Sequence, residues 1–415
     1  MHILLIHQAF CGPQDPGGTR HYELARRLAR MGHRFTIVTS QYSYLTGKEK
    51  SAFPNHYQIE VRFAGAIGGW HRSYFQRVVA FLSFMITAVI TGLRVETPDV
   101  VIGTSPPLFQ AISAWLIATL RRRPFILEIR DLWPEFAVSL GLLRGRVLIW
   151  FARRLESFLY ARAKEIIVNS PSYREYLLEQ GIPESKISVI PNGVDTSMYC
   201  PELNGDAFRR DHGMHDKFVV MYAGALGFAN DIGCLLRAAA RMHHRADIVF
   251  AIVGDGKELP RLRSEADSLR LNNVSFVAAQ SKENMPNVLA AADVCVATLK
   301  DARMLKTTYP NKVFDYMAAG RPTVLAIDGA IREVIEKSQG GIFVPPGDDA
   351  ALAEAILVLY ESAELRKEMG QSARSFVASH FDREIQAEQI AEILHRQSSR
   401  DLAPIKDADV AVPRL

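Results

Sequence analysis

The sequence predicts an α/β protein made of two doubly wound halves, each built around its own parallel sheet. The chain has 415 residues, more than one hydrophobic core usually supports, so we expect two domains of about 200 residues each. Short apolar stretches of strand length alternate with amphipathic helical stretches, as in α/β folds. The alternation breaks in a polar, patternless stretch over 201–216 and then begins again, which predicts a linker there.

The first half opens with a βαβ unit. An apolar stretch over His2–His7 has strand length, and a glycine-rich loop follows it. The segment Arg20–Met31 has Leu24 and Leu28 four residues apart, as in an amphipathic helix, and the β-branched Phe35–Thr39 completes the unit. Further strands are predicted at Asp99–Gly103, Pro124–Ile129, Glu165–Val168 and Ile187–Ile190.

The second half repeats the pattern. A strand over Lys217–Tyr222 leads into Gly224, a helix is expected from about residue 231 to 243, and a strand over Ala246–Val253 follows. Three more strands are predicted at Val274–Val277, Val294–Ala297 and Thr323–Ala326. The expected division is a first domain over 1–200, the linker over 201–216, a second domain over 217–380, a terminal helix over 381–398 and a disordered tail over 399–415.

Composition excludes several classes of protein. With 48% hydrophobic and 23% charged residues, the chain is not mostly disordered. The four cysteines stand singly, which argues against a zinc ribbon or a disulfide scaffold and fits a reducing compartment. The start of the chain lacks the basic region of a signal peptide, so we expect a cytoplasmic protein or one attached to the inner face of the membrane.

Cofactor motifs are absent from the sequence. Neither half has G-x-G-x-x-G after its first strand, and there is no Walker A string, which argues against a nicotinamide oxidoreductase and a P-loop enzyme. The twelve histidines include no HExxH, and no carboxylate cluster accompanies them, so no metal is expected. Residues 1–200 carry a formal charge of +8 and the remainder −4, which suggests that the halves face different partners; no nucleic acid is expected among them.

The most informative string of the chain covers 307–322. Pro310 suits the first turn of a helix, and Gly320 suits its end, where φ is often positive. Lys312 beside the free N–H groups of the helix start forms an anion site suited to a diphosphate. Asp315, one turn later on the same face, could accept hydrogen bonds from ribose hydroxyls. Taken alone, Lys312 and Asp315 are equally a surface pair at i,i+3.

This string resembles the signature helix of retaining family-4 glycosyltransferases, which have the GT-B fold of two Rossmann-like domains facing across a cleft. Asp315-Tyr316-Met317-Ala318-Ala319-Gly320-Arg321-Pro322 is similar to the family's Glu-Ala-Met-Ala-x-Gly-x-Pro, with Asp in place of the second Glu of a Glu-x7-Glu motif. Other segments that resemble the family cover nearly the whole chain: Pro191-Asn192-Gly193-Val194-Asp195, Tyr222-Ala223-Gly224 and Val253-Gly254-Asp255-Gly256. The strings Pro310-Asn311-Lys312 and Arg130-Asp131-Leu132-Trp133-Pro134-Glu135 are similar to the branch that builds bacterial O-antigen, capsule and exopolysaccharide, including members that transfer fucosamine-type sugars.

The resemblance implies that the second half binds a nucleotide sugar, UDP-linked. The first Glu of the motif falls at Thr307, which cannot accept two hydrogen bonds, so a deoxy or N-acetylated sugar is expected. The Arg and Lys of many relatives fall near Ala225 and Asn230. The diphosphate is therefore expected to meet Lys312, Lys306 or Arg303 and the backbone around Gly224 and Gly227, and Lys312 is also expected to be catalytic. The expected donor-binding residues are Gly17, Gly18, Arg20, Gly224, Gly227, Val277, Arg303, Lys306, Thr307, Asn311, Lys312 and Asp315.

The first half contributes a glycine loop and an acidic candidate. Gly17 and Gly18 resemble the family's loop after the first strand, where glycine lets the backbone approach a phosphate, although an ordinary turn has the same composition. Arg20 is expected to add a positive charge from across the cleft. Asp131 follows a predicted strand and is expected to accept or orient the acceptor's hydroxyl proton; the alternative is that it caps a turn. His7 is expected to be structural.

One apolar helix bears on the acceptor. Val78–Leu93 is nearly apolar, with Ser83, Thr87 and Thr91 as a narrow polar stripe, and is shorter than the roughly 20 residues of a membrane span. It is either a helix packed on the sheet or one partly embedded in the bilayer surface. Basic residues that would assist the second arrangement are Arg121, Arg122, Arg123, Arg153 and Arg154.

These observations together predict a retaining glycosyltransferase that moves a sugar from a UDP-sugar to a polyprenyl-diphosphate-linked saccharide. It would act at the anionic inner leaflet, in bacterial cell-surface polysaccharide biosynthesis, and the last helix would pack back on the first domain, as in relatives. Two alternatives stay open: a UDP-sugar 2-epimerase of the same fold and a non-catalytic nucleotide-sugar-binding protein.

Overall fold

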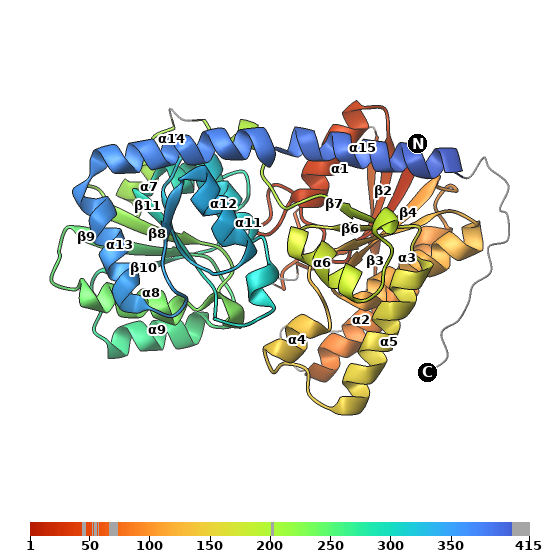
Figure 1. Ribbon diagram of the computed structural model, residues 1–415, viewed down its shortest axis with the longest axis horizontal. Coiled ribbons are helices and arrows are strands. Elements are labelled where there is room, and N and C mark those ends of the chain that lie inside the picture. The colour runs from red at the N-terminus through yellow and green to blue at the C-terminus, as the bar shows by residue number, and fades with distance from the viewer. Residues whose placement is uncertain are drawn as a thin grey trace.

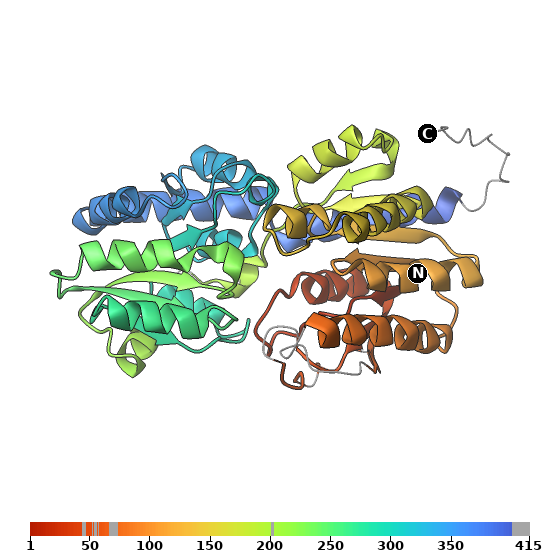
Figure 2. The ribbon, with the colours of Figure 1, turned by 90° about the horizontal axis from the view of Figure 1, so that it is seen from below.

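The protein has two lobes, each with a parallel sheet covered by helices, which lie side by side (Figures 1 and 2). The computed structural model describes residues 1–43, 47–51, 53, 56, 58–65, 74–200 and 203–400. Most of the tail expected to be disordered, residues 401–415, lies outside the described residues.

The amino-terminal lobe has a seven-stranded sheet in the order β3-β2-β1-β4-β5-β6-β7. The strands, all parallel, are β1 (His2–Ile6), β2 (Arg34–Ser40), β3 (Ile59–Ala64), β4 (Val100–Ser105), β5 (Phe125–Ile129), β6 (Glu165–Val168) and β7 (Ile187–Val189). Its helices are α1 (Arg20–Arg30), α2 (Tyr74–Leu93), α3 (Leu108–Arg121), α4 (Glu135–Ser139), α5 (Arg146–Arg162) and α6 (Pro171–Glu179). The central strands β1, β4, β5 and β6 are buried at every position, as expected for a parallel sheet covered on both faces.

The carboxyl-terminal lobe has a six-stranded parallel sheet in the order β10-β9-β8-β11-β12-β13. Its strands are β8 (Phe218–Ala223), β9 (Ile248–Val253), β10 (Val274–Val277), β11 (Val294–Thr298), β12 (Thr323–Ala326) and β13 (Gly341–Phe343). Its helices are α7 (Asp206–Asp211), α8 (Ile232–Arg241), α9 (Leu259–Ser268), α10 (Met285–Ala290), α11 (Asn311–Ala318), α12 (Ala330–Ser338), α13 (Asp349–Glu361) and α14 (Ala363–His380). In both lobes the connections change direction beside the first strand, between β1 and β4 and between β8 and β11. Ligands of such sheets bind outside the carboxyl ends of the strands at these points.

The segment expected to be a patternless linker differs from the prediction. Within 201–216 it contains α7, which packs on the carboxyl-terminal lobe: Phe208 and Met214 are buried in that core. A Cβ on Gly205 would lie 2.1 Å from the Cα of Ala291, so only glycine allows the two backbones this close. The chain instead crosses between the lobes just before Val194, whose side chain already belongs to the second core.

A second crossing joins the lobes near the end of the chain. α14 lies on the carboxyl-terminal lobe, and α15 (Arg383–Arg400) continues onto the amino-terminal one, where it contacts α1 (Figure 1). At this junction the N–H of Val194 donates to the carbonyl of Phe381, and the N–H of Arg383 donates to the carbonyl of Val194. A Cβ on Gly193 would lie 2.1 Å from the Phe381 oxygen, so the two crossings meet at a position that requires glycine. Leu394 and three other α15 side chains complete the core between α1 and the sheet: Ala387, Ile390 and Ile393.

Helix α2 covers the range expected to be helical and has two different faces. Ala80, Phe84 and Ala88 are fully buried, and the helix packs against α3. The opposite face carries Leu82, Ile86 and Ile90, which are between 39% and 58% exposed. The helix is therefore packed in the core on one side and apolar and exposed on the other, so neither of the two expected arrangements alone describes it.

Candidate functional site

The loops at the carboxyl ends of the strands meet at the boundary between the lobes. The side-chain amide of Asn192, after β7, donates to the carbonyl of Tyr309 at 2.7 Å. The hydroxyl of Ser170, after β6, donates to the carbonyl of Thr307 at 2.6 Å. Each bond joins one lobe to the segment just before α11, so the start of α11 faces the amino-terminal lobe.

Lys312, in the first turn of α11, reaches back to the loop that follows β8. Its ammonium donates to the hydroxyl of Tyr222 at 2.6 Å and to Oδ1 of Asn230 at 2.7 Å. Tyr222 in turn donates to the carbonyl of Ala225. Burial lowers the pKa of Lys312 to about 7. A carboxylate would restore that pKa, but both partners are neutral, so the ammonium retains its capacity to pair with an anion.

The Lys312 stem lies against the glycine loop of the carboxyl-terminal lobe. A Cβ on Gly224 would lie 3.3 Å from Cε of Lys312, and one on Gly227 would lie 3.5 Å from Nδ2 of Asn230. The expected donor residues Gly224, Gly227 and Lys312 are thus brought together by the structure. Asn311 is adjacent, and its Oδ1 is buried without a hydrogen-bond partner among the described residues.

Asp315 has a protein partner where a ribose was expected. Its Oδ1 accepts from the ammonium of Lys282 at 2.5 Å, and both side chains are mostly buried. Lys282 also lies 3.4 Å from the hydroxyl of Tyr199. The next residue, Glu283, donates its N–H to the carbonyl of Pro13, so this loop also contacts the facing lobe. A ribose hydroxyl would share Asp315 with Lys282 or displace it.

Other expected donor residues have surroundings that differ from those of Lys312. The ammonium of Lys306 pairs with Asp301 at 3.0 Å and with Asp328 at 3.2 Å, so it is already neutralised. Arg303 is exposed. Thr307 donates its hydroxyl to the carbonyl of Met304, and its own carbonyl accepts from Ser170 of the other lobe. The remaining expected residue is buried in the core of its lobe: Val277.

Arg20 does not face the other lobe as expected. Only 2% of this residue is exposed, and its Nε donates to Glu128 at 2.9 Å. Its two other nitrogens donate to the carbonyls of Pro191 and Ile190 at 2.7 and 2.8 Å. Glu128 also accepts from His21 at 2.5 Å. Arg20 is thus a structural cation that ties α1 to the sheet, because every arm of its guanidinium has a protein acceptor.

The cation at the first glycine loop is Arg130 instead. It follows β5 directly, and a Cβ on Gly18 would lie 3.9 Å from its Nη2. Its Nη1 lies 3.2 Å from Nε2 of His7, which follows β1. Gly17 has φ +142° and a Cβ there would lie 2.9 Å from Sγ of Cys11, so glycine is required by the turn itself.

Asp131 lies beside Arg130 at the same edge of the sheet. Burial raises the pKa of Asp131 to about 6, and the Arg130 charge opposes the shift. Burial and, after it, the Asp131 carboxylate raise the pKa of Tyr173, which lies in α6 close to Ser170, the residue that bonds to Thr307 of the other lobe. Asp131 is therefore near the interlobe contact, with a pKa suited to accepting a proton near neutral pH.

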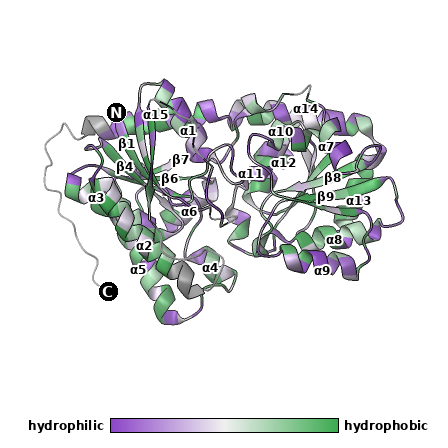
Figure 3. Cartoon of the chain, turned by 180° about the vertical axis from the view of Figure 1, so that it is seen from behind, coloured by the Kyte–Doolittle hydropathy of each residue, from purple (hydrophilic) through white to green (hydrophobic). Residues whose placement is uncertain are grey.

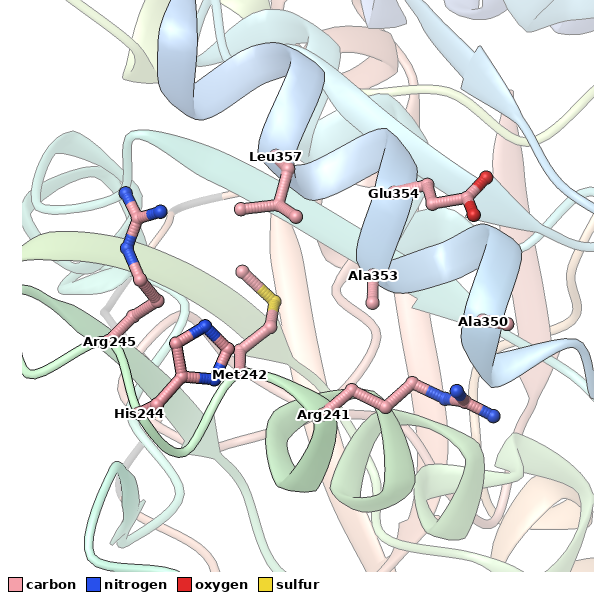
Figure 4. A pocket seen from close by; sticks show the side chains of 8 residues that line it. All are labelled: Arg241, Met242, His244, Arg245, Ala350, Ala353, Glu354 and Leu357. Atoms are coloured by element: carbon pink, nitrogen blue, oxygen red, sulfur yellow. The ribbon is translucent and has the colours of Figure 1, made fainter.

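No group of three or more His, Cys, Asp and Glu side chains is arranged to hold a metal ion within the part of the chain that the structure describes. A hollow lies between α8 and α13 (Figure 4). Two of its lining residues, Arg241 and Arg245, precede β9, so the hollow lies toward the amino ends of the strands, away from their carboxyl ends. Its other lining residues are Met242, His244, Ala350, Ala353, Glu354 and Leu357. The hollow is thus not part of the candidate site.

Two family models match the chain, one on each lobe. Residues 17–193 match the glycosyl transferase 4-like domain, and residues 217–362 match glycosyl transferases group 1. The matched ranges together span well over half of the chain and contain the two glycine loops and α11. The chain is a glycosyltransferase of GT-B fold.

Relatives of this glycosyltransferase include proteins of bacterial polysaccharide synthesis. WcaI of Escherichia coli K12, named as a colanic acid biosynthesis glycosyl transferase, is 24% identical over 92% of this chain and 97% of its own length. AmsK of Erwinia amylovora, an amylovoran biosynthesis glycosyltransferase, is 26% identical over 57% of this chain and 58% of its own. Alpha-D-kanosaminyltransferase of Streptomyces kanamyceticus is 26% identical over 45% and 47%.

Solved structures share the fold of this glycosyltransferase. Sucrose-phosphate synthase of Thermosynechococcus elongatus superposes with a TM-score of 0.78 at 18% identity, covering 96% of this chain and 99% of its own. HepE of Anabaena, solved in complex with UDP-glucose, has a TM-score of 0.72 at 20% identity, covering 95% and 100%. At these identities, the two similarities show the fold alone.

Sequence reasoning missed three contacts of this glycosyltransferase. Asn230 was noted as the position of a missing lysine, but not as the partner of Lys312. The pairing of Lys282 with Asp315 left no local signal, because the two residues lie 33 positions apart. Arg130 was noted only as part of a string that resembles the family; its place directly after a central strand was the available signal.

Asp131 gives the first testable prediction. We expect Asp131→Asn to lower kcat by about a hundredfold, in the range for loss of a general base. In the wild type, kcat should rise with pH through about 6, because the carboxylate is the active form and burial raises its pKa. The pH profile of kcat at saturating acceptor measures both. Full turnover by the Asn variant would remove Asp131 from the mechanism; Asp211→Asn, exposed at the end of α7, is the control.

Proposed function

We propose that this protein is a retaining glycosyltransferase that moves a sugar from a UDP-sugar to a lipid-linked saccharide in bacterial cell-surface polysaccharide synthesis. The carboxyl-terminal lobe would bind the donor and the amino-terminal lobe the acceptor. The observation that supports the proposal most strongly is the Lys312 ammonium, which neutral partners hold beside a glycine loop. This loop lies where the chain connections change direction, between the neighbouring strands β8 and β11.

A diphosphate fits the surroundings of Lys312. The first N–H groups of α11 have no intrahelical acceptors, the backbone at Gly224 is accessible without a side chain, and the ammonium supplies a positive charge. This combination neutralises a leaving diphosphate with protein groups alone. UDP as the nucleotide is supported by HepE, which shares the fold and was solved with UDP-glucose.

The donor sugar is proposed to be deoxygenated or N-acetylated. Thr307, at the position of the family's first Glu, has no carboxylate to offer the sugar. Its hydroxyl already donates to the carbonyl of Met304. The kanosaminyltransferase relative is named for an amino sugar, which agrees with this choice. A fucosamine-type sugar belongs to the same class.

Retention is proposed to proceed on one face of the sugar. The leaving diphosphate, held by Lys312, would help to deprotonate the acceptor hydroxyl, and Asp131 would orient that hydroxyl or accept its proton. This mechanism needs no pair of carboxylates flanking the sugar, in contrast to glycosidases.

A lipid-linked acceptor is supported by an apolar surface at one corner of the amino-terminal lobe. Trp150 and Phe151 of α5 are 52% and 60% exposed, and α2 carries exposed apolar side chains on the same lobe. In Figure 3 both helices lie on one side of this lobe, and α3 packs between them. We call this the α2–α5 surface; its exposed apolar side chains are Leu82, Ile86, Ile90, Leu142, Val147, Leu148, Trp150 and Phe151. Exposed arginines accompany them at Arg144, Arg146, Arg153 and Arg154. Exposed aromatic residues beside cations suit the interface of an anionic bilayer.

The structure limits how the protein could meet a membrane. In the ranges that the structure covers, no helix combines the length and hydrophobicity needed to cross a bilayer. Contact through the α2–α5 surface would therefore be peripheral, on the inner face of the plasma membrane, where lipid-linked saccharides are presented.

Vesicle binding tests this surface. We expect Trp150→Ser/Phe151→Ser to weaken binding to phosphatidylglycerol-containing vesicles by tenfold or more, since fully burying one such side chain contributes about 1.5–3 kcal/mol. Moderate salt should release the wild type, because the arginines contribute through charge. Cosedimentation measures both, with Val358→Ser on α13 as an exposed apolar control. Equal binding to neutral and anionic vesicles would contradict the proposal.

Transfer itself separates the proposal from its alternatives. The protein is incubated with a panel of UDP- and GDP-sugars, with and without a polyprenyl-diphosphate saccharide, and the products are separated. Sugar on the lipid supports the proposal. An isomerised UDP-sugar would indicate a 2-epimerase, and binding without turnover would indicate a nucleotide-sugar-binding protein.

A further inference from the structure

We propose that Arg130 is the substrate-phosphate-binding residue of the amino-terminal lobe and that His7 holds its guanidinium in place. Arg130 directly follows β5, and His7 directly follows β1. Between them runs β4, which carries Thr104 near its carboxyl end. The three residues stand at the point where the sheet changes direction, the position that binds ligands in such sheets.

Only one assignment of donors and acceptors fits the hydrogen bonds of His7. A guanidinium can only donate, so the bond between Arg130 Nη1 and His7 Nε2, at 3.2 Å, requires Nε2 to be the unprotonated acceptor. The proton of the neutral ring is then on Nδ1, which donates to Oγ1 of Thr104 at 2.8 Å. His7 is 1% exposed, and burial, His21 and Arg130 all lower its pKa, which keeps the ring neutral.

A chain of bonds from the backbone is compatible with this assignment of donor and acceptor. The N–H of Gln8 donates to Oε1 of Gln110 at 2.7 Å, so the other end of this amide is the NH2 group. That NH2 donates to Oγ1 of Thr104 at 2.8 Å, which leaves the hydroxyl as an acceptor on this side too. A backbone N–H thus orients the Gln110 amide, and Oγ1 of Thr104 accepts from both Gln110 and His7.

The rest of the Arg130 side chain has no acceptor among the described residues. Nη1 bonds to His7, while no hydrogen bond or ion pair occupies Nε or Nη2. Arg20 differs, since each of its three guanidinium nitrogens donates to Glu128 or to one of two carbonyls. Nη2 lies next to Gly18, which has no side chain to exclude a ligand. Arg130 is thus a partly exposed cation with free donors at the switch point, and phosphate oxygens are the substrate groups that match them.

The inference rests on the proposed substrates, which contain phosphate in two places. Arg130 could bind the diphosphate of the donor or that of the lipid-linked acceptor. Inorganic pyrophosphate and UDP, without acceptor, report on a donor-type site, and the KM for acceptor at saturating donor reports on the other. Pyrophosphate contains neither the sugar nor the nucleobase of the donor. Its binding therefore tests Arg130 even if the proposed donor sugar or nucleotide is wrong.

We expect Arg130→Gln to weaken the binding of pyrophosphate and UDP by about ten- to hundredfold, the loss that follows from removing one charge-assisted hydrogen bond. If the acceptor is the source instead, its KM rises by the same factor while UDP binding is unchanged. Arg62→Gln, on the edge strand β3, is the matched control, and urea unfolding checks that each variant is folded. Folded Arg130→Gln with an unchanged Kd for pyrophosphate and UDP and an unchanged acceptor KM would overturn the proposal.

His7 is tested as a positioning residue. His7→Phe removes the acceptor of the Arg130 bond, while His7→Gln can still offer an oxygen to the guanidinium. We expect His7→Phe to raise the same Kd or KM that Arg130→Gln raises, with a smaller change in kcat, and His7→Gln to restore most of the loss. If His7 had only a structural role, both variants would lower stability and neither would selectively change the Kd or KM. Equal Kd and KM values for His7→Phe and His7→Gln would therefore argue against His7 as the residue that holds Arg130.

Discussion

We expect Lys312→Met to weaken the binding of UDP-sugars by about ten- to hundredfold and to lower turnover with it. The ammonium offers the diphosphate a charge-assisted hydrogen bond of about 1.5–3 kcal/mol, and methionine keeps the length of the stem without the charge. The stability of the protein should not fall, because the buried ammonium has only neutral partners and carries the full cost of desolvation. Isothermal titration with UDP and urea unfolding measure the two effects.

The pH dependence of binding identifies the ammonium more directly. Burial lowers the pKa of Lys312 to about 7 in the free protein, and a bound diphosphate would raise it again. Binding above about pH 7 therefore takes up a proton, and the affinity should fall by up to tenfold per pH unit as pH rises. Lys312→Met should show neither effect. Asn230→Lys in that background should restore part of the affinity, since its side chain adjoins the ammonium, and Lys337→Met on α12 serves as control.

Breaking the buried pair of Arg20 and Glu128 should make the protein much less stable than the wild type. We expect Glu128→Gln or Arg20→Met to lower the free energy of unfolding by about 3–5 kcal/mol, because each leaves an uncompensated buried charge or unmet donors. Urea unfolding measures the loss.

The same variants distinguish a structural Arg20 from a ligand-binding one. Arg20→Met/Glu128→Leu should be more stable than either single variant, since no unpaired charge remains. At low urea the folded Arg20→Met protein should bind UDP as the wild type does. A large loss of UDP affinity with unchanged stability would return Arg20 to the donor site. Arg62→Gln, in an exposed pair with Glu60, should change stability by no more than about 1 kcal/mol.

Much of the fold could be predicted from the sequence because buried parallel strands are continuous apolar runs. The strands over Glu165–Val168 and Val274–Val277 were expected at their observed bounds. The edge strands β3 and β13 were missed: β3 mixes polar and apolar residues on a half-exposed edge, and β13 has only three residues. Edge strands are stabilised by their one neighbour more than by their own pattern.

The site was predictable where its chemistry is local and not where it depends on pairing. Lys312 at a helix start beside a glycine loop follows from residue order. The role of Arg20 does not, because its partner Glu128 lies 108 positions away. Asp315 illustrates the same limit: its spacing from Lys312 indicated a ribose carboxylate, but Lys282 comes from another loop and occupies one oxygen.

The position of α15 has a consequence for how the chain is made. The last described helix supplies Ala387, Ile390, Ile393 and Leu394 to the core beneath α1, although α1 is translated first. While the ribosome is still adding the second lobe, that core is open to solvent and its apolar groups lack their cover. The first lobe can therefore reach its native state only after α15 has been made, and a premature stop near residue 380 would damage the amino-terminal lobe.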